Sequence, residues 1–434
     1  MNYQQALDYI HALSRHGWVL GLNRVSRLLA RVGNPQNKGK FLHIAGTNGK
    51  GSLVQLSGNL LMQAGYKVGK YTSPYVLEFR ERFTVNDEMI SETDLAAWTT
   101  RLKPMVDKLE GEGVLITEFE FITVLAFCWF AQMECDVVCL EVGLGGRFDA
   151  TNVISHPVAC LIASISLDHT AILGDTVEEI AAEKGGILKS GCLAVIYPEM
   201  HSGAAQVLRT IGKEVGAQVI QPDPAALTVL EETPFGSRFT VEGKEYQVSL
   251  AGRHQCFHAQ MVLTLLPVLQ QAGFRVTQEH AKLAFAHTRF SGRFSVLCRR
   301  PFVVVDGAHN PEGIAGLGEI LSHIPCPKRI AAGMLGDKAV EENLKLLSRY
   351  SDTLICLPVD NPRALSPKEL AGLAKPYFAQ VEWYDQVQTG LEAALEGLEK
   401  DEMLLVCGSF FLAGEAVHRL DGLLPKEEKN HPGK

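Results

Sequence analysis

The sequence lacks the features that mark membrane-spanning, secreted and nucleic-acid-binding proteins. Its 434 residues contain no apolar run of ~18 residues, the length that a membrane-spanning helix needs. No basic segment followed by an apolar one opens the chain, so we expect no secretory signal and a cytoplasmic location. The 49 Asp and Glu residues outnumber the 41 Lys and Arg residues, and the formal net charge is −8. A basic footprint for nucleic acid is therefore not expected.

Paired cysteine motifs are also missing. None of the ten cysteines forms a C-x-x-C pair, and several, such as Cys139, lie inside apolar runs. We therefore predict buried, reduced thiols in place of disulfides or a zinc site. What the sequence does have is 46% hydrophobic and 21% charged residues, the composition of an ordinary globular enzyme of two or three domains.

Short apolar runs alternate with helical patterns along most of the chain. This alternation predicts parallel strands joined by helical crossovers. It breaks near residues 289–293 and then restarts, while residues 217–250 alternate as a small antiparallel patch would. We predict an α/β protein. Residues 1–292 would form a phosphate-loop ATPase-type domain with a parallel sheet, and residues 293–434 a smaller Rossmann-like α/β domain.

A glycine-rich loop lies between the first predicted strand, residues 41–45, and a predicted helix that starts near Lys50. Residues 46–52 have the sequence G-T-N-G-K-G-S. Glycines let backbone N–H groups approach phosphate oxygens, the helix N-terminus adds partial positive charge, and Lys50 adds a full charge. The spacing before the lysine is shorter than in the common G-x-x-x-x-G-K-[ST] loop, and a plain tight turn is the alternative. We predict a nucleotide phosphate site.

Polar side chains follow three other predicted strands. Glu141 ends one strand and is followed by a second glycine-rich stretch, His169 comes after the next strand, and Asp306 ends a strand of the second domain. Acids in such places commonly bind Mg²⁺, a ribose or a base. A surface acid, a surface histidine and a helix cap are the respective alternatives, although Asn310, before Pro311, is the better cap. Lys184, on a predicted helix, could also be part of a solvated charged face.

Five motifs occur in a fixed order: G-T-N-G-K-G-S, E-V-G-L-G-G-R-x-D-A-T-N, L-D-H, E-K-x-G-I and D-G-A-H-N-P. Together they resemble the folylpolyglutamate synthase and dihydrofolate synthase family, which is related to the Mur ligases. The resemblance runs from about residue 20 to residue 415. It implies an ATP-dependent ligase that adds L-glutamate to a folate and its polyglutamates through an acyl phosphate. ATP and two Mg²⁺ ions would be the cofactors, and the protein would be a monomer.

The resemblance also implies roles for individual residues. The nucleotide would contact Asn48, Gly49, Lys50, Gly51, Ser52, His258, Arg293 and Asp306. The metal ligands would be Ser73, Glu141 and His169. The catalytic residues would be Lys50, Lys184, which the family carries as a carbamate, and His309, which would face the phosphates. The folate side would be formed by Thr117, Phe119, Glu120, Phe148, Asp149 and Ala150.

Two positions depart from the family's pattern. The family motif H-Q-x-x-N-A has asparagine near the adenine, where this chain has His258, and a histidine cannot offer the paired donor and acceptor of an amide. Family members that also use dihydropteroate have the early motif D-L-G-L-x-R-V. This chain has Val19 at the position of the acid in that motif. Glu118 and Glu120 could substitute for that acid. We expect tetrahydrofolates to be the better substrates and dihydropteroate a poor or absent one.

Two other classes of function stay open on the sequence alone. A Mur-type ligase acting on another carboxylate would be expected to carry a uridine-nucleotide domain before its phosphate loop, and only 45 residues precede Gly46 here. A phosphate-loop ATPase or nucleotide-binding regulator would not need the D-G-A-H-N-P turn. Release of ADP that requires both a folate and glutamate would distinguish the three.

Overall fold

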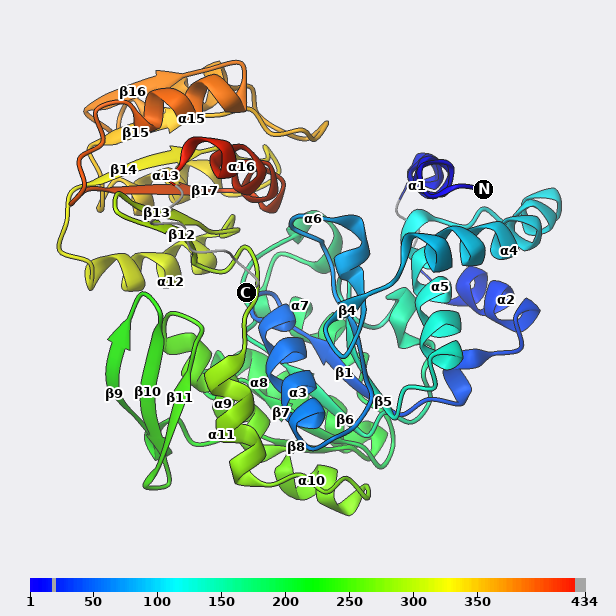
Figure 1. The fold of residues 1–434 in the computed structure, drawn as a ribbon. Coiled ribbons are helices and arrows are strands. Elements are labelled where there is room, and N and C mark those ends of the chain that lie inside the picture. Colours follow the sequence, from blue (N-terminus) through cyan, green and yellow to red (C-terminus); the bar gives the residue numbers. More distant parts are fainter. Residues whose placement is uncertain (18–20, 426–434) are drawn as a thin grey trace. The chain divides into compact units, whose positions relative to one another are not determined.

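The computed structural model describes residues 1–17 and 21–425, which divide into two compact units (Figure 1). Unit 1 is formed by Met1–Tyr75, Phe79–Ala225 and Phe257–Phe285. Unit 2 is formed by Val76–Glu78, Ala226–Cys256 and the chain from Ala286 onward.

This division differs from the predicted boundary between residues 292 and 293, mainly because residues 226–256 group with the C-terminal part of the chain. Ser249 Oγ donates a hydrogen bond of 2.5 Å to the carbonyl of Ala286, and Gly252 lies against Ile320. Such contacts join segments that are far apart in sequence, so no break in the local pattern could show them.

Unit 1 is built on one large sheet. Within the described residues it has eight strands in the order β4-β3-β2-β5-β1-β6-β7-β8. The strands are β1 (Phe41–Ala45), β2 (Val68–Tyr71), β3 (Phe83–Val85), β4 (Glu88–Met89), β5 (Val137–Glu141), β6 (Ala159–Ile162), β7 (Leu193–Ile196) and β8 (Gln218–Ile220). From β2 to β8 every pair is parallel, and β3 and β4 extend the edge in antiparallel fashion. The centre of the sheet is β1, whose neighbours are β5 and β6.

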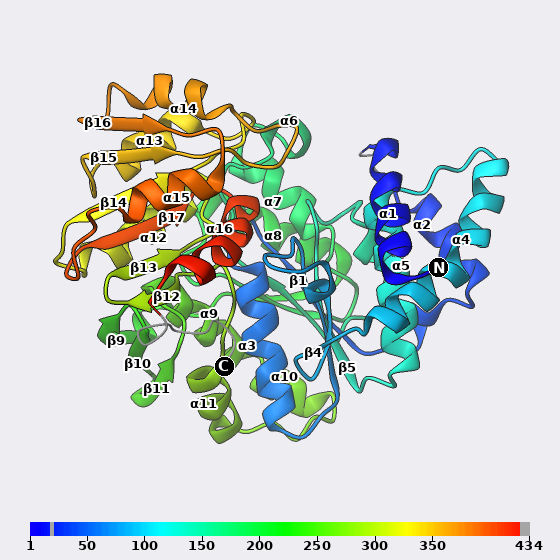
Figure 2. The ribbon, with the colours of Figure 1, turned by 45° about the horizontal axis from the view of Figure 1, so that its top comes forward.

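Helices connect and cover these strands, as the alternating pattern predicted. They are α1 (Tyr3–Ala12), α2 (Asn23–Arg31), α3 (Lys50–Gln63), α4 (Glu92–Gly111), α5 (Glu118–Gln132), α6 (Thr170–Leu173), α7 (Val177–Gly185), α8 (Ser202–Val215) and α10 (Leu266–Gln271), while α9 (Arg253–Thr264) and α11 (Gln278–His287) have residues in both units. The helices α1, α2, α4 and α5 pack together (Figures 1 and 2). Nearly all of α5 is buried because it is apolar on every side.

Unit 2 contains two sheets within the described residues. The larger has the order β12-β13-β17-β14-β15-β16, and only β12 is antiparallel. Its elements are β12 (Ser295–Arg299), β13 (Phe302–Val305), α12 (Pro311–Ser322), β14 (Lys328–Ala332), α13 (Val340–Leu347), β15 (Thr353–Cys356), α14 (Pro367–Ala374), β16 (Gln380–Trp383), α15 (Val387–Leu395), β17 (Met403–Cys407) and α16 (Phe410–Leu423). The smaller sheet is antiparallel and comprises β9 (Leu227–Thr233), β10 (Gly236–Val241) and β11 (Lys244–Val248). The predicted α/β class is therefore confirmed.

Two general expectations can be compared with this fold. All ten cysteines are free, and eight of them are buried, as their place in apolar runs predicted. Across residues 1–17 and 21–425, no helix combines the length and the apolar character that crossing a bilayer requires.

Candidate active site

The phosphate loop, residues 46–52, connects the end of β1 to the start of α3 in unit 1. Lys50 Nζ folds back over the loop and donates to the carbonyl oxygens of Gly46 and Thr47, both at 3.1 Å. The backbone N–H of Thr47 donates to Ser164 O, which follows β6, at 2.7 Å. The loop is thus hydrogen-bonded to the segment that follows β6. Lys50 lies at the N-terminus of α3, where the helix dipole favours an anion.

Lys184, near the end of α7, lies at the same point of the loop. Its side chain is 3% exposed, and Nζ donates to Gly46 O at 2.8 Å. Because Lys50 uses the same oxygen, the two ammonium nitrogens lie within about 6 Å of each other. The alternative of a solvated helix face is excluded for Lys184, and the structure brings together two of the three predicted catalytic residues.

His258 packs directly on the phosphate loop. Gly49 is the N-cap of α3 with φ +88°, and the imidazole of His258 occupies the space where a β-carbon at Gly49 would lie. The His258 ring is 3% exposed and is also 5.6 Å from the ring of Tyr197. Gly51 and Ser52 are buried in the first turn of α3. The predicted phosphate-binding residues and His258 therefore form one continuous cluster.

The predicted metal ligands come together in part. Glu141, at the end of β5, is 4% exposed, and its Oε2 accepts a hydrogen bond of 3.2 Å from the backbone N–H of Ser73, which follows β2. His169 has the left-handed φ of +51°, and its backbone N–H donates to the Asp168 carboxylate. In the described part of the chain, no three His, Cys, Asp or Glu side chains gather into a group that could hold a metal ion. A carboxylate beside a hydroxyl residue still suits Mg²⁺, which prefers oxygen ligands and keeps waters and substrate phosphates.

The stretch from Gly143 to Asn152, here called the Asp149 loop, is fixed against α7. The N–H of Arg147 donates to Glu183 O at 2.8 Å, and a β-carbon at Gly146 would meet backbone atoms of residues 183 and 184 at 2.8 to 3.0 Å. Asn152 Nδ2 donates to Arg147 O at 2.9 Å. The Asp149 loop therefore lies directly on the turn of α7 that bears Lys184. Glycine is needed at position 146 because a side chain there would collide with the backbone of that turn.

Asp149 organises this loop through its buried carboxylate. The carboxylate accepts the N–H of Leu144 at 3.0 Å, the N–H of Thr151 at 2.9 Å and the Thr151 hydroxyl at 2.5 Å. Desolvation by burial raises the pKa of Asp149, and these hydrogen bonds act in the opposite direction. On either side of it, Phe148 is 43% exposed, while Ala150 is buried. Asp149 is thus a structural anchor, with the exposed Phe148 ring beside it.

The other residues predicted for the folate side begin α5. Thr117 and Glu120 form a capping box, in which each side chain accepts the other residue's backbone N–H. Glu120 also pairs with Arg24 of α2 at 2.9 Å, so both of its oxygens have partners and it is poorly placed to replace a missing acid. The ring of Phe119 packs on Gly143, at the start of the Asp149 loop. Val19, the departure noted above, lies outside the described residues.

Unit 2 has its own polar cluster at the ends of β12 and β13. Asp306 is buried and accepts the N–H groups of Phe294 and Ala308, both at 2.7 Å. Burial raises the pKa of its carboxyl group, and the Arg293 charge opposes that rise. The Arg293 guanidinium lies 4.7 Å from the centre of the Phe410 ring, at the start of α16. Arg293 and Asp306 are therefore neighbours, as the prediction of a shared role requires.

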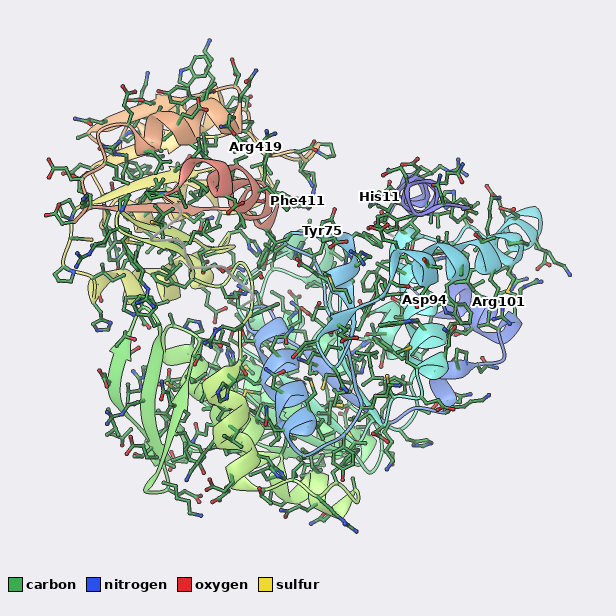
Figure 3. All side chains as sticks on the ribbon, viewed as in Figure 1. His11, Tyr75, Asp94, Arg101, Phe411 and Arg419 are labelled. Carbon is green, nitrogen blue, oxygen red and sulfur yellow. The ribbon has the colours of Figure 1, made fainter. Side chains whose placement is uncertain are left out.

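His309 belongs to the same cluster. Its Nδ1 lies 2.9 Å from Gly307 O, and its ring centre is 5.5 Å from that of Phe410. Asn310, and not Asp306, caps α12, because its Oδ1 accepts the N–H of Gly313 at 2.9 Å. The cap interpretation of Asp306 is thus wrong. Phe411, labelled in Figure 3, follows Phe410 and is 42% exposed.

Two residues for which no role was predicted, His43 and Thr151, are hydrogen-bonded to the site. His43 lies in the middle of β1, is fully buried, and hydrogen-bonds Thr151 through Nε2 at 2.9 Å. Thr151 bonds Asp149 in turn. A signal was available in the strand sequence F-L-H-I-A, where His43 is the one polar residue of an apolar run at the centre of the sheet.

Comparisons with known proteins show which family the chain is similar to. The Mur ligase glutamate ligase domain matches residues 292–410. The dihydrofolate synthase/folylpolyglutamate synthase of Bacillus subtilis is 34% identical, with 96% of this chain and 99% of that protein covered. The Lacticaseibacillus casei folylpolyglutamate synthase is 32% identical, with 97% and 99% covered.

Solved structures match over nearly the whole length. The Mycobacterium tuberculosis folylpolyglutamate synthase complexed with ADP and AMPPCP has a TM-score of 0.88 at 28% identity, with 98% of this chain and 100% of that chain covered. The Escherichia coli FolC structure in complex with DHPP and ADP has a TM-score of 0.85 at 29% identity, with 98% of each chain covered.

The phosphate loop between β1 and α3 and the glutamate ligase domain define a ligase of the Mur type. Among ligases of this type, the Bacillus subtilis relative is 34% identical over nearly the full length of both chains, which is enough to show the family. The chain belongs to the folylpolyglutamate synthase/dihydrofolate synthase family.

Proposed function

We propose that this protein is an ATP-dependent ligase that joins the amine of L-glutamate to a carboxylate of a folate, and that it extends folates to polyglutamates. The observation that carries the proposal is that Lys50 and Lys184 both donate to one carbonyl of the phosphate loop. The chain is also related over nearly its whole length to a dihydrofolate synthase/folylpolyglutamate synthase. The Lys50 ammonium at a helix N-terminus favours a polyphosphate anion, and Lys184 lies within reach of the same loop carbonyl.

The chemistry requires activation of the folate carboxylate, because oxide is too poor a leaving group for direct attack by an amine. Transfer of the ATP γ-phosphoryl group to a carboxylate oxygen forms an acyl phosphate and releases ADP. The glutamate nitrogen then attacks the acyl carbon, the C–N bond forms, inorganic phosphate leaves with the bonding electrons, and the nitrogen loses a proton. One ATP is consumed for each amide formed.

The phosphate loop would balance the negative charge that gathers in the first step. Lys50 lies over the loop carbonyls, from which its ammonium would turn towards a bound γ-phosphate, while N–H groups at the start of α3 would face the other phosphates. Bound Mg²⁺ would supply further positive charge between the nucleotide and the carboxylate. We propose Ser73 and Glu141 as its ligands, because their side chains start from adjoining positions, and His169 as a ligand of a second ion.

Lys184 would act as a carbamate. Only the uncharged amine reacts with CO₂, and the Lys50 ammonium within about 6 Å opposes a second positive charge on Lys184. The resulting anion would be attracted both to Lys50 and to the metal, and would orient metal-bound water or bind the metal directly. The close approach of two lysines supports this assignment.

The remaining roles follow the family resemblance. We propose that His258 lies near the adenine, that Arg293 and Asp306 contribute to the nucleotide site, and that His309 faces the phosphates. The folate would contact Thr117, Phe119, Glu120, Phe148, Asp149 and Ala150. For Asp149 and Glu120 that contact would be made by the backbone or by the outer side of the carboxylate, since both oxygens of Asp149 and Oε2 of Glu120 already accept hydrogen bonds. A monomeric state and a cytoplasmic location stay predictions.

Release of ADP tests the function directly. The purified protein is assayed with ATP, Mg²⁺, L-glutamate and either a tetrahydrofolate or dihydropteroate, with each component omitted in turn. We expect ADP release to require both the pterin substrate and glutamate, with a higher kcat/KM for the tetrahydrofolate. ADP release without any folate would contradict the proposal. Release that requires another carboxylate would favour the Mur-type alternative.

A further inference from the structure

A buried histidine connects the phosphate-loop strand to the Asp149 loop. His43 lies on β1, three residues before Gly46, with Leu140 of β5 and Cys160 of β6 as its neighbours across the sheet. Its side chain is 0% exposed, and its Nε2 lies 2.9 Å from Thr151 Oγ1. An apolar residue would suit this place in the sheet better, since burying a polar ring has a cost unless its hydrogen bonds are made.

The hydrogen-bond directions along this connection can be assigned. The Thr151 hydroxyl has one hydrogen, and it donates that hydrogen to Asp149 Oδ1 at 2.5 Å. The His43 ring must therefore be the donor to Thr151, through Nε2–H. The ring remains neutral, because burial lowers the pKa of His43 to about 3, with Lys189 adding to the effect. The chain of donors thus runs from His43 to Thr151 to Asp149.

The connection ends on the group that shapes the loop. The Asp149 carboxylate accepts the N–H groups of Leu144 and Thr151 as well as the Thr151 hydroxyl. It therefore joins the first and last parts of the Asp149 loop, with Phe148 and Ala150 on either side of it. Loss of the Thr151 hydroxyl would leave a desolvated carboxylate with fewer donors and would leave His43 Nε2–H without its acceptor.

We propose that His43 and Thr151 are positioning residues for folate binding, which fix the Asp149 carboxylate and thereby hold Phe148 and Ala150 in the shape that receives the substrate. The inference rests on the proposed function, because it takes the Asp149 loop to contact the folate. Neither residue touches the reacting atoms. The connection starts on β1, but its hydrogen bonds end on the Asp149 loop, so its loss should affect the folate side and leave the phosphate loop in place.

Thr151→Val is the central test, because valine keeps the shape of threonine and removes only the hydroxyl. We expect the KM for a tetrahydrofolate to rise by about tenfold, the equivalent of one lost buried hydrogen bond, with the KM for ATP and kcat changing by about twofold or less. Thr151→Ser keeps the hydroxyl and should return the folate KM to about the wild-type value. The thermal unfolding midpoint is measured for each variant.

A matched control is available at Thr99 in α4, which is also fully buried and whose hydroxyl donates to its own helix at Leu95 O, at 2.8 Å. Thr99→Val should lower the unfolding midpoint about as much as Thr151→Val and leave the folate KM unchanged. Equal effects of the two valine variants on the folate KM would show that a buried hydroxyl acts only on stability, and would overturn the proposal.

A second variant keeps the inference testable if Thr151→Val does not fold. His43→Gln retains an N–H at about the position of Nε2 and should raise the folate KM less than His43→Leu does. Equal folate KM values for both His43 variants and the wild type would contradict the proposal. Absence of folate-dependent ADP release in the wild type would contradict the proposed function instead, so the two failures are distinct.

Discussion

Lys50 and Lys184 donate to the same backbone oxygen, that of Gly46, although they belong to different helices. One lysine starts α3 and the other lies in the last turn of α7. Their meeting depends on β1, whose end supplies Gly46. Two like charges so close together repel each other, and either a bound anion or modification of one lysine would relieve that repulsion.

Modification of Lys184 can be detected without measuring activity. After incubation with ¹³C-labelled bicarbonate near neutral pH, we expect a ¹³C NMR signal of a lysine carbamate in the wild type. The signal should be absent from Lys184→Arg, because a guanidinium does not form a carbamate, and present in Lys184-containing variants such as Thr99→Val. A wild-type spectrum without the signal at saturating bicarbonate would rule out the carbamate.

Glu141→Gln should reduce kcat by about 10² to 10³, because an amide cannot replace the charge of a metal-binding carboxylate. The fold should survive, since glutamine keeps the size of the side chain and can still accept the N–H of Ser73. ADP release over a range of Mg²⁺ concentrations, with circular dichroism as the check on folding, measures both effects. A variant with near wild-type turnover at low Mg²⁺ would show that Glu141 is not a ligand.

Gly49→Ala should weaken ATP binding strongly. Its β-carbon would overlap the His258 ring, and the φ of +88° is unfavourable for alanine. We expect the KM for ATP to rise by at least about tenfold, with part of the loss recovered in the double variant Gly49→Ala, His258→Ala, which removes the overlap. Strictly additive effects of the two substitutions would show that the ring and the loop do not press on each other.

Acid should destabilise the protein through two buried histidines. Burial lowers the pKa of His43 to about 3 and that of His254 to about 4, the latter helped by Arg293. Below about pH 6.5 the unfolded chain binds a proton at each site and the folded protein does not, so stability is lost as the pH falls towards the folded pKa values. The loss should approach about 1.4 kcal/mol per pH unit for each histidine.

Urea unfolding at about pH 7 and about pH 5 measures this loss. His43→Gln should flatten the dependence, whereas substitution of the exposed His156 by glutamine should not. A His43→Gln profile as steep as that of the wild type would mean that His43 is protonated in the folded state.

The strands that lead to the site could be predicted because each is a short apolar run that ends in glycine or a polar residue, as β1, β5 and β13 show. The strand β12 was missed, since it pairs with β13 in antiparallel fashion and no helix comes before it to complete a βα pattern. Before the first strand, the described residues contain the helices α1 and α2, and a 3₁₀ turn after α1 ends at Gly17, whose φ of 65° is positive.

Within the site, the sequence could indicate residues at strand ends but not the direction of their side chains. The position of Lys50 after a glycine loop predicted a phosphate-facing ammonium, whereas its return to two loop carbonyls depends on the fold. The hydrogen bond between His43 and Thr151 could not be inferred, because the two residues are far apart in the sequence and meet only when β1 lies beside β5 and β6.

The path of the chain through the two units limits how the gene can be divided. The chain enters unit 2 three times: for Val76–Glu78, for the segment with strands β9 to β11, and from Ala286 onward. In the first of these segments, Leu77 O lies 3.2 Å from Nε2 of His418 on α16. A single stop codon at position 292 would leave the first two segments attached to unit 1 without the residues they pack against. Separate expression of the two halves would therefore expose apolar surface on both, and a working split enzyme would need its break inside a surface turn, with both pieces produced together.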